Sequence, residues 1–146
     1  MSRHTTRRQG RDEGSVAIEA AILVPVLLLL VLLALTAGRI ALAGQAVDSA
    51  AEDAARDASI ARDPNQATGA ATSAASASLA QQGLHCTSTP SVTVRIQMGP
   101  TGTGGTATAT VVCQVALSDL AFPGAPGTHT VRSTFTSAID RYVERP

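Results

Sequence analysis

The longest unbroken apolar segment of the chain lies near its start. Residues 20–38 contain no charged side chain, and as a helix these residues cover about 28 Å, close to the roughly 30 Å hydrocarbon thickness of a bilayer. The densest part, from Ile22 to Leu33, shows no helical alternation of apolar and polar positions. The buried helix of a soluble domain therefore fits it less well. The pattern predicts one membrane-spanning helix over residues 15–38.

A one-sided helical pattern continues beyond this segment. Small and apolar residues recur every three or four positions: Ile40, Ala43, Val47, Ala50, Ala54, Ala58 and Ala61. This spacing predicts that the same helix extends through residues 39–62 as a stalk. A stripe made mostly of alanine lets a partner helix approach closely, although alanine is also simply a good helix former.

A second, weaker helical segment follows at residues 63–83. Asp63 and Pro64 are typical of a helix start, and Gly83 is typical of a helix end. Between them the residues are almost all alanine, serine, threonine and glycine, a composition that also suits a flexible linker. Helix and linker both remain open for this segment.

The remaining residues, 84–146, show the period of two that is typical of strands. Three strands are predicted: Val92 to Met98, Ala107 to Leu117 and Thr130 to Ser137. A glycine-rich loop joins the first two, and a Pro/Gly loop around Phe122 precedes the third. The predicted fold class is α+β, with a long N-terminal transmembrane and stalk helix followed by a small antiparallel β module.

Charge divides the chain as unevenly as hydropathy does. The net charge is zero, yet residues 1–14 carry a charge of +2 and residues 15–38 hold one charged group, Glu19. Because arginine-rich flanks stay on the cytoplasmic side, the N-terminus is expected inside and residues 39–146 outside. The neutral balance argues against a basic nucleic-acid-binding protein. A cleaved secretory signal ending near Ala41-Leu42-Ala43 is the alternative, although its apolar stretch would be unusually long.

Two cysteines, Cys86 and Cys113, fall in the predicted exported part. An oxidising compartment permits a disulfide between them. Closing a loop of this length would stabilise the module by about 3.5 kcal/mol. The alternative is a pair of unrelated buried thiols.

The single acid of the apolar segment has a distinctive setting. Glu19 is the fifth residue after Gly14, and the run between them reads GSVAIE. A carboxylate in an apolar segment is a candidate functional group, because placing its charge in a bilayer is unfavourable. A glutamate in the first turn of a helix is also favoured simply by the helix dipole.

With these residues the chain resembles the type IV pilin family, and within it the TadE-like pseudopilins of tight-adherence (Flp/Tad) pilus systems. The resemblance implies a lollipop-shaped minor pilin that a prepilin peptidase cuts between Gly14 and Ser15. Glu19 would then be residue five of the mature chain and could pair with the new amino terminus of a neighbouring subunit. The family usually has an aromatic residue after this glutamate, where the present chain has Ala20.

The resemblance also implies partners and a location. The partners would be a prepilin peptidase, the membrane platform of the pilus assembly machine, other pilins or pseudopilins and membrane lipid. The protein would lie in the cytoplasmic membrane as a single span, or in a cell-surface pilus. Small residues four positions apart favour helix association in membranes, which assigns helix packing to Ala34, Gly38, Ala37 and Ala41.

No local motif predicts catalysis or a cofactor. The three histidines are far apart in sequence, and the pair His85-Cys86 lacks the neighbouring ligands that a zinc site needs. We therefore expect a structural protein that is not an enzyme and that binds no cofactor, metal or nucleic acid. The rival interpretation is a membrane-anchored extracytoplasmic binding module that never enters a filament.

Overall fold

The computed structural model describes residues 12–100, 103–120 and 124–140. The expected loop residue Phe122 and the C-terminal residues 141–146 lie outside the described ranges. The chain divides into two compact units, residues 1–37 and residues 38–146, which are described separately.

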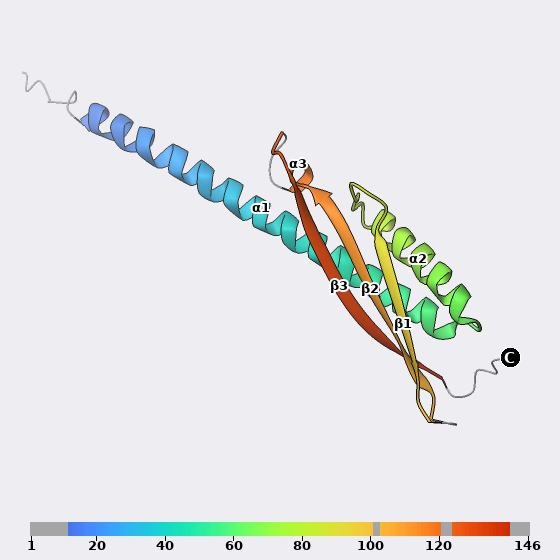
Figure 1. Cartoon of the computed structure of the whole chain (residues 1–146). Coiled ribbons are helices and arrows are strands. Elements are labelled where there is room, and N and C mark those ends of the chain that lie inside the picture. Colours follow the sequence, from blue (N-terminus) through green and yellow to red (C-terminus); the bar gives the residue numbers. More distant parts are fainter. Residues whose placement is uncertain (1–11, 101–102, 121–123, 141–146) are drawn as a thin grey trace, which may run out of the picture. The chain divides into compact units, whose positions relative to one another are not determined.

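The first unit is formed by the N-terminal part of helix α1, which extends from Asp12 to Ile60 (Figure 1). Pro25 lies inside this helix without ending it. From Val16 to Leu35 every side chain is exposed, so no part of the described chain covers the apolar surface of this segment. The long N-terminal helix predicted for residues 15–62 is confirmed.

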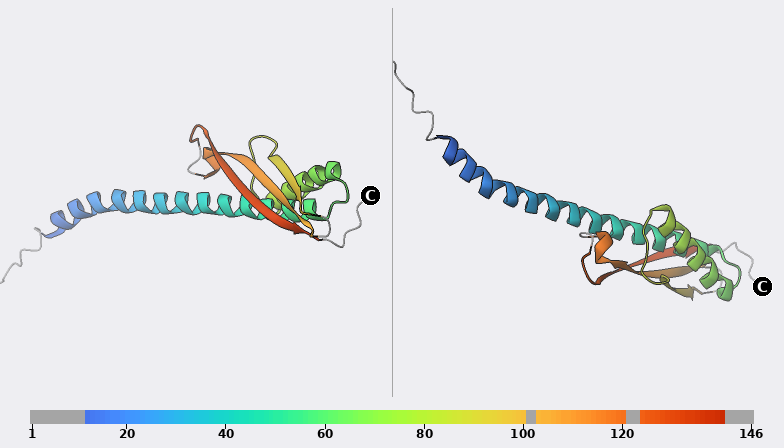
Figure 2. Two further views of the ribbon diagram at one scale, coloured as in Figure 1. Left: turned by 60° about the horizontal axis from the view of Figure 1, so that its bottom comes forward. Right: turned by 90° about the horizontal axis from the view of Figure 1, so that it is seen from above.

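The second unit has two layers. The C-terminal part of α1 and helix α2, Pro64–Gln81, lie on one face of a three-stranded sheet (Figure 2). Helix α2 begins where the carboxylate of Asp63 accepts a hydrogen bond from the backbone N–H of Asn65, and it is followed by Gly83 with a positive φ of 68°. Residues 63–83, for which helix and linker were both open, are thus mainly helical.

The sheet is antiparallel throughout, with β2 in the centre. Its strands are β1 (Ser91–Met98), β2 (Gly105–Ala116) and β3 (Thr128–Ile139), in the order β1-β2-β3. The α+β fold class with a small antiparallel sheet is therefore confirmed. The sequence pattern placed Leu117 in the second strand, which is wrong. Leu117 instead opens the short helix α3, Leu117–Leu120, which turns Leu120 into the core.

The sheet has one buried face and one hydroxyl-rich outer face. The side chains buried from β2 are Ala107, Ala109, Val111, Cys113 and Val115. On the outer face Thr108 hydrogen-bonds Thr136 over 2.9 Å and Thr110 hydrogen-bonds Thr134 over 2.9 Å. Threonine pairs that face each other across two strands stabilise a sheet, which explains why a strand reading TATAT forms the centre of this one.

The alanine stripe of α1 belongs to the core of the second unit. Its fully buried members are Val47, Ala50, Ala54 and Ala58, and they cluster with α2 and the inner face of β2. The helix that approaches this stripe is therefore the chain's own α2, and the sheet covers the stripe as well. Alanine is suited to this role because its small side chain lets two layers approach closely.

Candidate functional site

The predicted processing site lies in the first turn of α1. Gly14 and Ser15 are the third and fourth residues of the helix that begins at Asp12. The first four backbone N–H groups of any helix have no acceptor within the helix. The N–H of the bond between Gly14 and Ser15 is therefore one of the four N–H groups of α1 that have no acceptor within the helix.

Glu19 lies about one turn further along the helix and is exposed. The apolar side chains that follow it are also exposed, including Ile22, Leu23 and Leu30. Among the described residues, α1 is the one helix that is long and apolar enough to cross a membrane, judged by length and composition. Glu19 is therefore a carboxylate at the start of an apolar surface that nothing in the described chain covers.

The small residues proposed for helix packing share one face of α1. Ala34, Ala37, Gly38 and Ala41 follow one another at intervals of three, one and three positions, which places all four within one side of a helix. All four are exposed, and a side chain added at Gly38 would meet no atom within 4 Å. This face differs from the stripe at Ala50 and Ala54, which is buried.

The two cysteines meet, as their place in the predicted exported part suggested. Cys86 and Cys113 form a disulfide that ties the segment after α2 to the central strand β2. Nearby, Thr87 strengthens the same junction, because its backbone N–H and its hydroxyl both donate to the carbonyl of Gln114. The alternative of two unrelated thiols does not hold, and Cys86 is not available to form a metal site with His85.

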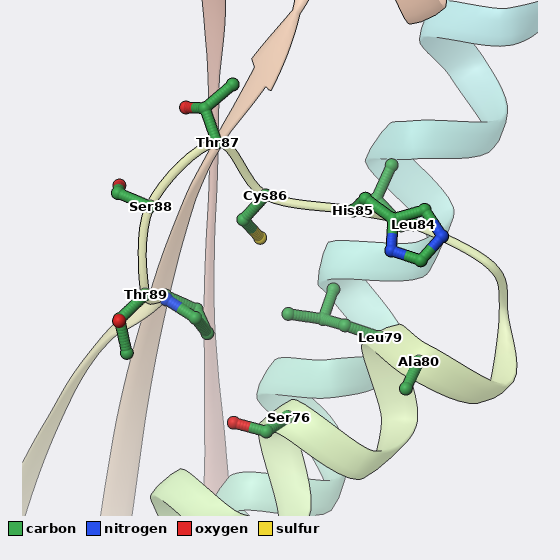
Figure 3. Close-up of a pocket in the computed structure, with 10 residues that line it drawn as sticks. Ser76, Leu79, Ala80, Leu84, His85, Cys86, Thr87, Ser88 and Thr89 are labelled. Atoms are coloured by element: carbon green, nitrogen blue, oxygen red, sulfur yellow. The ribbon is translucent and has the colours of Figure 1, made fainter.

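A hollow lined by both polar and apolar side chains lies between the end of α2 and the segment that leads into β1. Its volume is about 590 Å³, and Figure 3 shows Leu79 and Ala80 on the helix opposite Cys86, Thr87 and Thr89 on the segment. Most of its polar groups are hydroxyls, and it contains no acidic or arginine side chain. Within the described residues, no group of three or more His, Cys, Asp or Glu side chains is placed to hold a metal ion.

A second hollow of about 310 Å³ is formed at the beginning of the second unit. Arg39 of α1 reaches it and donates from Nη1 to the backbone carbonyl of Asp119 over 3.5 Å. No sequence motif singles out Asp119. The one available signal was the position of Arg39, an isolated cation directly after the apolar run.

These features define a class of protein: an α+β chain with an exposed apolar N-terminal helix able to span a membrane and a disulfide in its second unit. Comparison with known protein families identifies the class more specifically. The sequence model of the family described as TadE-like protein matches residues 14–56. Over these residues the chain matches the TadE-like family, and the predicted resemblance is confirmed. The family suggests involvement in Tad pilus systems.

No curated protein and no solved structure matches the chain significantly. The family match ends at Arg56, four residues before the end of α1. It therefore covers the apolar helix and the part of the stripe up to Ala54, but not α2, the disulfide or the sheet.

Proposed function

We propose that the protein is a structural pseudopilin, a minor pilin that takes part in assembly of a tight-adherence pilus. The observation that carries the proposal is the family match, which begins at Gly14 and includes Glu19 and the exposed apolar segment of α1. Its role is structural and non-enzymatic. Its partners are a prepilin peptidase, the membrane platform of the assembly machine and other pilins.

Processing occurs between Gly14 and Ser15. The position of this bond in the first turn of α1 supports cleavage there. Unwinding that turn removes few hydrogen bonds, because its N–H groups lack helical acceptors. Glycine at position 14 presents no side chain beside the bond to be cut, so the peptidase can approach the backbone closely.

Glu19 sets the register between subunits after cleavage. The new amino terminus at Ser15 is a cation four residues before Glu19, at the same end of the apolar helix. An isolated carboxylate and an isolated ammonium are each unfavourable in a membrane or filament core, whereas a well-placed pair offsets much of that penalty. The amino terminus of one subunit therefore pairs with Glu19 of the next.

The proposed orientation places the N-terminus in the cytoplasm and the second unit outside. Four arginines precede the apolar run, and such flanks stay on the cytoplasmic side. The disulfide between Cys86 and Cys113 supports this orientation, because disulfides persist in oxidising compartments outside the cytoplasm.

Processing is tested by coexpressing the full chain with a prepilin peptidase from the same type of pilus system. The intact mass should fall by that of residues 1–14, and the new N-terminus should be Ser15. Gly14→Val should abolish the shortening, because a branched side chain blocks the approach to the bond. Gly10→Val, the same change four residues earlier in the leader, should leave it intact. An unchanged mass of the wild-type chain, with a peptidase active on its major pilin, would contradict the proposal.

Incorporation into a filament is tested separately by shearing cells and probing the released pili. The wild-type protein should appear in the sheared fraction, and Glu19→Gln should lower its amount there without changing cleavage. Glu13→Gln, which alters a residue that cleavage removes, is the matched control. Exclusive recovery in membranes, with normal pili in its absence, would favour the rival membrane-anchored binding module.

A further inference from the structure

The hollow of about 310 Å³ in the second unit combines opposite charges with apolar walls. The side chains that matter are Arg39 and Leu42 from α1, Leu84 and His85 after α2, and Asp119 and Leu120 from α3. Ligand pockets usually measure roughly 300–1,000 Å³. The hollow is thus large enough for a small polar group and too small for two acyl chains.

The position of the hollow along the chain indicates its surroundings. Arg39 directly follows Gly38, the last residue of the apolar run, so the hollow begins within one residue of the end of that run. Leu42, one turn further along α1, is 65% exposed, although it is a large apolar residue at the rim of the hollow. At a membrane interface an arginine lays its methylene stem along apolar surface and extends its guanidinium to the headgroups.

The two charged groups of the hollow do not neutralise each other. One guanidinium nitrogen of Arg39 donates to the backbone carbonyl of Asp119, while the carboxylate of Asp119 accepts from the hydroxyl of Ser118 over 3.3 Å. Within the described residues no ion pair joins the side chains of Arg39 and Asp119. Since guanidinium has five N–H donors, most of them stay available to an added acceptor.

We propose that this hollow binds the headgroup of an ethanolamine-type phospholipid from the leaflet at which α1 leaves the membrane. The phosphate accepts hydrogen bonds from Arg39, and the ammonium group lies against the carboxylate of Asp119. Leu42, Leu84 and Leu120 contact the glycerol and the first methylene groups, while the acyl chains stay in the bilayer. A guanidinium and a separate carboxylate on one small hollow match a headgroup that carries one phosphate and one ammonium.

This site depends on the membrane anchoring proposed for the chain. It also adds a step to assembly, because the bound lipid must be released when α1 leaves the bilayer. The lipid therefore helps to hold the subunit in the membrane until the assembly machine extracts it.

The test uses the full chain in nanodiscs that contain phosphatidylethanolamine and phosphatidylglycerol in equal amounts. After transfer to mild detergent, native mass spectrometry should find one retained phosphatidylethanolamine per chain. Arg39→Gln should reduce the retained fraction by about tenfold or more, since it removes a charge-assisted hydrogen bond. Arg95→Gln, the same change on β1 outside the hollow, should have no effect. Asp119→Asn should equalise retention of the two lipids.

Two further measurements keep the result interpretable. Each variant must be shown to be folded, by the absence of reactive thiols under nonreducing conditions and by an unchanged melting temperature. If Arg39→Gln does not fold, Leu42→Gln at the exposed rim replaces it, and the same loss of retained lipid is expected. Equal retention by wild type and a folded hollow variant would overturn the proposal, as would equal wild-type retention of both lipids. A chain that is membrane-bound and correctly cleaved but retains no lipid refutes this site alone. A chain that does not associate with membranes refutes the anchoring.

Discussion

The hydroxyl of Ser137 on β3 donates to the hydroxyl of Ser59 in the last turn of α1 over 3.2 Å. Ser59 is buried, and its own hydroxyl donates to the backbone carbonyl of Arg56 over 2.7 Å. This chain of hydrogen bonds joins the edge strand to the helix at a place where both residues are small. The helix and the sheet are therefore connected by a polar contact in a core made mostly of alanine.

The Ser137 contact predicts a measurable loss of stability. Ser137→Ala removes the donor to Ser59 and should lower the free energy of unfolding by about 1 kcal/mol, the usual net contribution of one hydrogen bond. Ser133→Ala, four positions earlier on the same face of β3, is the control and should have a smaller effect. Urea unfolding of the full chain in detergent measures both. Equal effects would show that the Ser59 contact contributes nothing specific.

The two small-residue faces of α1 should respond differently to enlargement. Ala54→Leu should destabilise the chain by about 1–3 kcal/mol, because Ala54 is fully buried against other elements and the added atoms have no space. Ala77→Leu, at an exposed position of α2, should leave stability nearly unchanged. Thermal unfolding in detergent distinguishes them. A tolerated leucine at position 54 would contradict the internal packing of the stripe.

A larger side chain on the exposed face of α1 around Ala34 should instead weaken the association of this helix with other helices in a membrane. Ala34→Leu should leave the melting temperature of the chain unchanged, because nothing in the described structure covers this position. It should weaken helix association in a membrane by preventing close approach. Energy transfer between labelled copies in vesicles measures association, and Leu35→Ala, on a neighbouring face, is the control. Unchanged energy transfer for Ala34→Leu would remove the packing role from this face.

The disulfide should contribute substantially to the stability of the second unit. Cys86 and Cys113 are 27 positions apart, and removing a bridge across such a loop costs about 3.5 kcal/mol in the chain-entropy model. The double variant Cys86→Ala/Cys113→Ala should unfold at a correspondingly lower urea concentration than the oxidised wild type. Labelling of the denatured, unreduced wild-type chain should find no free thiol. Two reactive thiols in exported protein would contradict the bridge.

Substitution of glycine by alanine should have opposite effects on stability at two positions. At Gly105, where β2 begins, an added Cβ would lie 2.6 Å from the carbonyl oxygen of Gln97, so Gly105→Ala should destabilise the hairpin. At Gly69, inside α2, an added Cβ meets no atom within 4 Å. Gly69→Ala should therefore stabilise the chain by up to about 1 kcal/mol, because alanine is the better helix former. Melting temperatures that shift in the same direction would refute this distinction.

Local sequence patterns were sufficient to predict the long helix and the three strands. The uncharged run of residues 20–38 and the spacing that follows it predicted α1. A continuous apolar run of this length is typical of a helix that faces lipid, and a repeat of three to four residues is typical of a helix packed on one layer. Alternation predicted the strands for the same reason. The setting of Gly14 and Glu19 indicated the family, since both residues lie within one short segment. Leu117 was misassigned because its alternation continued the strand, whereas the turn that buries Leu120 depends on distant packing.

Tertiary structure alone decided which surfaces remain free. The alanine stripe around Ala54 and the small residues around Ala34 look alike in sequence, yet the sheet and α2 cover the first and nothing in the described chain covers the second. In the same way Arg39 and Asp119 are 80 positions apart and meet only because α3 folds back toward α1. The residues next to a position in the sequence largely determine whether it lies in a helix or a strand. The residues that it contacts across the fold come from distant segments, which meet only when the chain folds.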